Sequence, residues 1–140
     1  PYLDSERDQQ SGGLDMSLEI FYSTEKMRAD QHPPARVART NSQYLYWTPA
    51  QLLTHHASNG CNLQPGDLFA TGTISGPARD ELGSMLELTY SGREPYTLPN
   101  GETRKFLEDG DEIVFRAVCK RDGFRRIGLG ECRGQIIHGA

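Results

Sequence analysis

The chain has 140 residues and carries 15 Lys and Arg against 19 Asp and Glu, for a formal net charge of −4. Hydrophobic residues make up 36% of the sequence and charged residues 24%, which is typical of a soluble domain. The mild acidity excludes a basic nucleic-acid-binding module, because phosphate binding requires clustered surplus Lys and Arg. No apolar stretch approaches the roughly 18 residues that a membrane span requires, so we expect neither a nucleic-acid partner nor a membrane partner.

The cysteines and the first residue bear on where the protein works. Cys61, Cys119 and Cys132 are odd in number and widely spaced, which disfavours a disulfide-bonded secreted domain or a zinc site. We expect reduced thiols, packed as small apolar side chains in a cytoplasmic protein. The chain begins with Pro1 rather than Met, so we expect it to be processed or to be part of something longer.

The N-terminal half predicts a flexible start, two strands and one helix. Residues 1–13 are polar, and we expect them to be flexible. Apolar and polar residues alternate over 14–22, which predicts a strand. Residues 23–35 indicate a loop, and 36–40 a further short strand. A helix is predicted over 49–58, because Thr48 can cap its N-terminus and Pro49 suits the first helical position.

The C-terminal half predicts strands and turns throughout. We expect strands at 68–71, 85–90, 112–120 and 124–137, with Asn100-Gly101 as the strongest hairpin signal because both residues tolerate positive φ. Six to eight strands with one short helix predict a mainly β domain with antiparallel hairpins.

A loop rich in hydroxyls and glycines follows the expected strand at 68–71. The loop contains three hydroxyl side chains, Thr71, Thr73 and Ser75, interleaved with glycines. Glycine allows a backbone to approach a ligand closely, and its amide can donate to an anion or a carbonyl oxygen. The pattern suits either a binding loop or a tight turn whose hydroxyls satisfy local backbone groups. It lacks the lysine of a phosphate-binding P-loop.

Glu87 interrupts an otherwise apolar stretch. If Met85 faces the core, Glu87 shares its face and becomes an inward carboxylate, a candidate general base or a group that orients a histidine. If Leu86, Leu88 and Tyr90 face the core instead, Glu87 is solvated, and periodicity alone favours this alternative.

Three further patterns have structural interpretations. His55 and His56 diverge by about 100° around a helix and are expected to pack or cap rather than to bind one metal. The aromatic residues of 44–47 are expected to supply core. The acidic residues of 108–112 lack EF-hand spacing and are expected to form a solvated turn.

Several strings in one order resemble the C-terminal part of the fumarylacetoacetase (fumarylacetoacetate hydrolase) family. They are residues 44–48 (YLYWT), 53–56 (LTHH), 59–63 (NGCNL), 65–68 (PGDL), 72–77 (GTISGP), 83–88 (GSMLEL), 100–107 (NGETRKFL) and 109–112 (DGDE). Each string is weak alone, but eight in order are specific, and the resemblance runs from about Leu14 to Gly134. It implies part of a mixed β-sandwich roll.

The resemblance implies a hydrolase that cleaves the carbon–carbon bond of fumarylacetoacetate, giving fumarate and acetoacetate in tyrosine and phenylalanine degradation. Glu87 matches the glutamate that orients a catalytic histidine, and Thr73 matches a substrate-binding threonine. The family implies Mg²⁺ and Ca²⁺, bound by residues upstream of this segment, and a homodimer. No residue of this chain is assigned as a metal ligand.

The chain departs from the family pattern in lacking the upstream histidine and metal-ligand motifs. We therefore expect 14–140 to be an incomplete C-terminal portion of a hydrolase domain after a flexible start at 1–13, and to be inactive alone. The alternatives are a related acylpyruvate or β-diketone hydrolase, or a non-catalytic β module.

Overall fold

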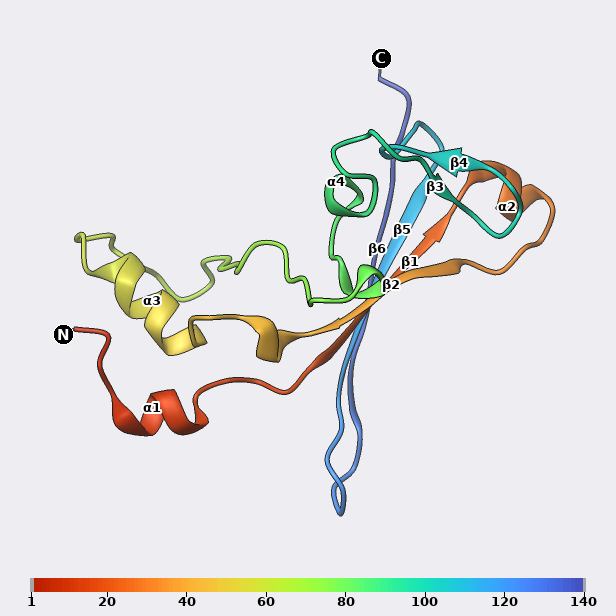
Figure 1. Cartoon of the computed structure of the whole chain (residues 1–140). Coiled ribbons are helices and arrows are strands. Elements are labelled where there is room, and N and C mark those ends of the chain that lie inside the picture. The colour runs from red at the N-terminus through yellow and green to blue at the C-terminus, as the bar shows by residue number, and fades with distance from the viewer. Residues whose placement is uncertain (1, 140) are drawn as a thin grey trace.

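A computed structural model describes residues 2–139. Figure 1 shows a twisted central sheet with a two-stranded sheet and short helices at one end, an arm carrying two helices, and a long hairpin. In chain order the elements are α1 (Glu6–Ser11), β1 (Ser17–Ser23), α2 (Glu25–Ala29), β2 (Ala35–Asn41), η1 (Ser42–Tyr44), α3 (Pro49–Ala57), η2 (Arg79–Glu81), α4 (Met85–Leu88), β3 (Tyr96–Thr97), β4 (Thr103–Arg104), β5 (Glu112–Cys119) and β6 (Ile127–Gln135).

The main sheet is antiparallel, in the order β2-β1-β5-β6, and β3 pairs with β4 in a separate two-stranded sheet. The expectation of a mainly β chain with antiparallel hairpins is therefore confirmed. The strands expected at 14–22, 36–40, 112–120 and 124–137 correspond to β1, β2, β5 and β6. Each of these strands pairs with a strand that is close to it in sequence, β1 with β2 and β5 with β6.

The two faces of the main sheet differ in chemistry. Residues paired across antiparallel strands share a face, so Glu19 of β1, Arg116 of β5 and Glu131 of β6 lie together on what we call the polar face. Arg116 pairs with Glu131 at 2.6 Å there, and Arg133 pairs with Glu112 at 2.6 Å. Leu18, Ile20, Tyr22, Ile113, Phe115 and Ala117 occupy the other face, which we call the apolar face.

The hydrophobic core covers one end of the apolar face. Its buried members are Tyr22, Met27, Val37, Leu88 and Leu98. Burying side chains of this size contributes about 1.5–3 kcal/mol each. Leu88 comes from α4 and Leu98 from the β3–β4 connection, so the core fixes the α4 region against the sheet.

Helix α3 begins and ends close to the predicted bounds of 49–58. Thr48 accepts from the backbone N–H of Gln51, and the Gln51 side chain accepts from the Thr48 N–H, which completes a capping box. Pro49 occupies the first turn, where its missing N–H is not needed. Gly60, with φ of +85°, follows the helix end.

Two predicted strands are wrong. Residues 68–71 have no regular secondary structure, and 85–90 contain helix α4 where an alternating strand was expected. The predicted loop at 23–35 also contains a helix, α2, which Thr24 caps by accepting from the Met27 N–H. In both segments a capping residue, Ser84 before α4 and Thr24 before α2, starts a short helix. The cap decides the local structure although the apolar residues show no helical periodicity.

Residues 6–11 of the segment expected to be a flexible start form helix α1, which lies beside α3 in the arm (Figure 1). The Thr48 hydroxyl donates to Asp8, and the Gln51 side-chain amide donates to the Leu3 carbonyl at 3.2 Å. The expected divisions 1–13 and 14–140 include Pro1 and Ala140, which lie outside the described residues.

The acidic turn at 108–112 is not fully solvated, contrary to expectation. Asp111 is only 1% exposed, and it accepts from the Arg104 guanidinium at 3.0 and 3.2 Å and from the Tyr22 hydroxyl. These hydrogen bonds raise the pKa of Arg104 above its ordinary value, although partial burial opposes the shift. Burial, followed by the bond to Asp111, raises the pKa of Tyr22.

Candidate functional site

Glu87 lies in the single turn of α4, whose start is set by Ser84. Ser84 has an extended backbone, with φ of −144°, and its hydroxyl accepts from the Glu87 N–H at 3.3 Å. Met85 and Leu88, three residues apart, pack on or in the core. Glu87 is directed elsewhere and is half-buried. It is therefore neither the inward residue of a strand nor a fully solvated one.

The Glu87 carboxylate is held by two hydroxyl groups. The Ser75 Oγ donates to Oε2 of Glu87 at 2.8 Å, and the Ser84 Oγ donates to the same oxygen at 2.7 Å. Ser75 belongs to the hydroxyl-rich loop, and its oxygen also accepts from the Gly83 N–H at 3.0 Å. The loop and the start of α4, separated by several residues in sequence, are thus joined through Glu87.

Gly83 permits this close approach. A Cβ at position 83 would lie 2.4 Å from the Ile74 carbonyl oxygen and 2.9 Å from Cγ2 of Thr73. Contacts that short do not occur for real side chains, so only glycine allows the loop and α4 to meet here. The close approach found here is between two segments of the same chain at Gly83, which lies outside the hydroxyl-rich loop; the expected approach of the loop glycines to a ligand stays a prediction.

Thr73 and Glu87 line one pocket of about 440 Å³, which we call the Glu87 pocket. Its walls are residues 44–46, residues 73–75, and the α4 region with Ser84, Leu86 and Glu87. Thr73 is exposed and also borders a second hollow of about 430 Å³ over the apolar face, which Phe115 and Leu129 line. The structure therefore brings together both residues that the family resemblance singled out.

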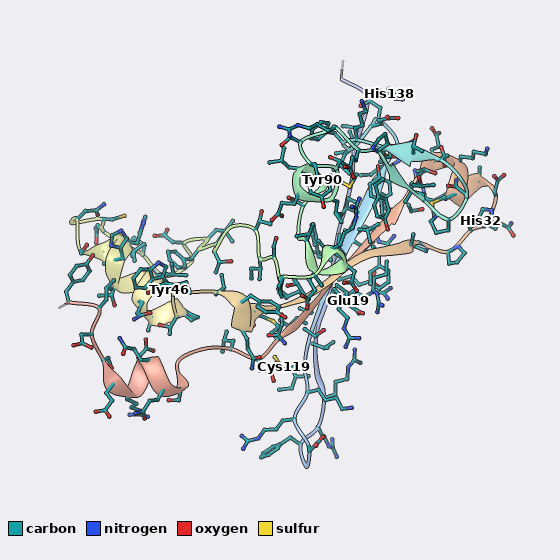
Figure 2. All side chains as sticks on the ribbon, in the orientation of Figure 1. Glu19, His32, Tyr46, Tyr90, Cys119 and His138 are labelled. Atoms are coloured by element: carbon teal, nitrogen blue, oxygen red, sulfur yellow. The ribbon has the colours of Figure 1, made fainter. Side chains whose placement is uncertain are left out.

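The expectation that the aromatic residues of 44–47 supply core is wrong, because Tyr44, Tyr46 and Trp47 are all exposed. Tyr44 and Tyr46 form part of the pocket wall instead. Tyr46 is 85% exposed (Figure 2), and its ring meets that of Trp47 edge-on at 4.7 Å between centroids. The Tyr44 hydroxyl donates to Glu81 at 3.0 Å, and this bond raises the pKa of Tyr44. The wall thus presents two phenol rings and the Leu45 side chain to the pocket.

The four histidines of the chain lie away from the Glu87 pocket, since none is among its lining residues. His55 and His56 are exposed rather than packed: His55 bonds the Tyr2 hydroxyl at 2.7 Å, and His56 meets the Phe69 ring edge-on. Figure 2 shows His32 beside the α2–β2 connection and His138 near the C-terminus. An imidazole partner for Glu87 is thus not supplied by residues 2–139.

Metal ligands do not converge within residues 2–139, where no three His, Cys, Asp or Glu side chains are placed to hold an ion. The three cysteines are free, but Cys61 and Cys132 are exposed, so the expected packing of all three is wrong. No helix described in residues 2–139 has the length and apolar character to cross a bilayer.

The family model and the curated relatives that match this chain belong to one family. The C-terminal model of fumarylacetoacetate (FAA) hydrolase matches residues 12–137. The fumarylacetoacetase of Homo sapiens is 54% identical over 103 residues, covering 74% of this chain and 24% of that protein. That of Oryza sativa is 44% identical over 137 residues, covering 98% and 30%, and that of Bos taurus is 48% identical over 124 residues, covering 89% and 28%.

The chain spans between about a quarter and a third of the length of these relatives. The family model nonetheless covers almost all of the chain, including the hydroxyl-rich loop, α4 and both long strands of the β5–β6 hairpin. The chain therefore belongs to the fumarylacetoacetate hydrolase family and matches its C-terminal portion.

Proposed function

We propose that this chain is part of a metal-dependent hydrolase that cleaves the carbon–carbon bond of fumarylacetoacetate, giving fumarate and acetoacetate in tyrosine and phenylalanine degradation. One observation carries the proposal: Thr73 and Glu87, which match functional residues of the family, line the same pocket in a chain 41–54% identical to proteins named fumarylacetoacetase. A cytoplasmic homodimer and a mixed β-sandwich roll in the complete domain belong to the same proposal.

In the proposed mechanism, Glu87 acts on an imidazole from outside this chain. Its free oxygen accepts the imidazole N–H, which fixes the ring and makes the other nitrogen a better base for a water molecule. The water oxygen attacks the carbonyl carbon, the carbon–carbon bond breaks, and the water proton passes to the leaving carbon. Thr73 donates to a substrate oxygen. Mg²⁺ and Ca²⁺ would be held by residues upstream of this segment, as the family resemblance implies.

The test uses the complete enzyme to which we assign this chain, with fumarylacetoacetate as substrate. We expect Glu87→Gln to lower kcat at least about a hundredfold with little change in KM, because the amide presents no charge to an imidazolium. We expect Thr73→Val, which removes one hydroxyl, to lower kcat/KM about tenfold. Glu94→Gln is the control, since Glu94 is exposed beside Arg79 and outside the pocket.

An unaltered kcat in Glu87→Gln would contradict the assigned role of Glu87, and preferential turnover of an acylpyruvate would contradict the assigned substrate. The 140-residue chain alone is expected to be inactive, because no histidine lines its pocket. Turnover by the isolated chain, with Mg²⁺ or Ca²⁺ added, well above that of its own Glu87→Gln variant would contradict this expectation.

A further inference from the structure

Two serines from separate segments converge on one oxygen of Glu87. Ser75 reaches it from the hydroxyl-rich loop at 2.8 Å, and Ser84 reaches it from the start of α4 at 2.7 Å. Hydrogen bonds to an ionised carboxylate are about twice as strong as those between neutral groups. Helix capping does not account for these two hydrogen bonds to Oε2. The cap requires only that the Ser84 oxygen accept from the Glu87 N–H.

The direction of both bonds is fixed by the backbone. The Gly83 N–H donates to the Ser75 oxygen at 3.0 Å, and the Glu87 N–H donates to the Ser84 oxygen at 3.3 Å. A backbone N–H can only donate, so each serine oxygen is an acceptor on that side. The single proton of each hydroxyl is then available for Oε2 of Glu87. Because hydrogen bonds in series polarise one another, the bond from the backbone N–H strengthens the bond from the hydroxyl to the carboxylate.

The second carboxylate oxygen is left for another partner. Within residues 2–139, Oε1 of Glu87 has no hydrogen bond, whereas Oε2 has two. The carboxylate lies on the wall of the Glu87 pocket, half-buried, with the loop behind it held by the contact at Gly83. Fixing one oxygen determines the plane of the group and the direction in which the other oxygen accepts.

We propose that Ser75 and Ser84 are positioning residues, which together hold Oε2 of Glu87 so that Oε1 faces the pocket ready to accept from an imidazole. The inference rests on the role of Glu87 under the proposed function. It adds to that role by making the activity depend on two hydroxyls of the pocket wall that act through Glu87.

The experiment measures kcat and KM with fumarylacetoacetate in the complete enzyme. We expect Ser75→Ala to lower kcat about tenfold with KM within about twofold, because a charge-assisted hydrogen bond is lost while the pocket wall remains. Ser75→Thr keeps the hydroxyl and should stay within about threefold of the wild-type kcat. Ser58→Ala is the control, because the Ser58 hydroxyl is exposed and bonds only the His55 carbonyl at the end of α3.

Ser84 needs variants that preserve its cap. Asn and Asp cap helices about as well as Ser, so Ser84→Asn and Ser84→Asp should both fold, as circular dichroism would check. The Asn amide can donate to Glu87, whereas the Asp carboxylate cannot. We expect Ser84→Asp to have a kcat at least about tenfold below that of Ser84→Asn.

A double-mutant cycle separates the inference from the proposed function. In a Glu87→Gln background, Ser75→Ala should change kcat less than about twofold, because the group that it positions is already disabled. An equal loss in both backgrounds, a loss confined to KM, or no loss at all would overturn the positioning role while Glu87→Gln still impairs catalysis. An unimpaired Glu87→Gln enzyme would overturn both the proposed function of Glu87 and the inference.

Discussion

Asp111 shows how much a single side chain contributes to this fold. It is one of the most buried residues, and it receives hydrogen bonds from Arg104, Tyr22 and the Glu108 N–H, the last at 2.8 Å. Arg104 itself is only 13% exposed. A charge pair this deeply buried adds little net stability over an apolar pair, but removing one partner leaves the other charge without compensation.

Asp111→Ala should therefore lower the free energy of unfolding by about 3–5 kcal/mol, as measured by urea denaturation. Asp122→Ala at the exposed tip of the β5–β6 hairpin is the control, with an expected change within about 0.5 kcal/mol. A loss below about 1 kcal/mol for Asp111→Ala would show that Arg104 finds another partner, such as Glu102 at 3.5 Å.

The burial of Asp111 could not be predicted from the sequence, because the other four residues of 108–112 are three acids and a glycine. Its partners Arg104 and Tyr22 are separated from it by 7 and 89 residues. Local composition therefore indicated a solvated turn. The packing of distant strands decided otherwise, and no local pattern reports such packing.

At the scale of elements, the long strands and helix α3 were predictable, and α4 was not. β1 has alternating apolar residues, β5 is rich in β-branched and aromatic residues, and α3 has a complete capping box. Helix α4 has four residues, too few to distinguish a period of 2 from one of 3.6. The signal that could have identified it is Ser84 three residues before Glu87, the spacing of a capping box.

The candidate site was predictable only in part. The family resemblance selected Thr73 and Glu87, and the structure places both on one pocket. The serines that hold Glu87 were missed or taken only as loop hydroxyls, because their convergence depends on the contact at Gly83. Pairwise contacts between segments of irregular structure leave no periodic trace in a sequence.

The short β3–β4 hairpin should lose stability in acid through Glu102. Hydrogen bonds from Thr24, and next from Asn100, hold the pKa of Glu102 below its ordinary value of 4.5. A lowered folded-state pKa means that the contribution is complete above about pH 4.5 and is lost as the pH falls through the folded-state pKa.

Glu102→Gln should therefore destabilise the chain by about 1 kcal/mol at pH 7, and by clearly less at pH 3, in urea denaturation at both pH values. Glu94→Gln, which alters an exposed pair, should remain within about 0.5 kcal/mol of wild type at both pH values. An equal Glu102→Gln effect at pH 7 and pH 3 would show that the carboxylate charge does not stabilise the hairpin.

At the scale of the whole molecule, the sheet is covered unevenly. The core packs on one end of the apolar face, while Phe115 is 49% and Leu129 is 61% exposed beside the second hollow. All nine residues of β6 are exposed, and β6 lies at the edge of the main sheet (Figure 1). Uncovered apolar surface of this kind is a recognised source of dye binding and association.

The 140-residue chain should accordingly enhance the fluorescence of the dye ANS under native conditions, and Leu129→Glu should reduce that enhancement without altering the circular dichroism spectrum. Phe124→Ser is the control, because Phe124 lies at the hairpin tip and does not line the hollow over the apolar face. Enhancement that is absent, or that responds equally to both substitutions, would contradict a dye site on this face.

The tight junction at Gly83 has a consequence for how such a pocket can change over evolution. The Ile74 carbonyl approaches Gly83 so closely that any larger side chain at position 83 would push the 73–75 loop away from α4. Substitutions elsewhere on the wall leave this main-chain contact in place. Residues 44–46 form the remaining wall, and Tyr46 projects into solvent there with 85% of its surface free. A change in the size of the pocket, by natural selection or in the laboratory, would therefore begin at that aromatic wall.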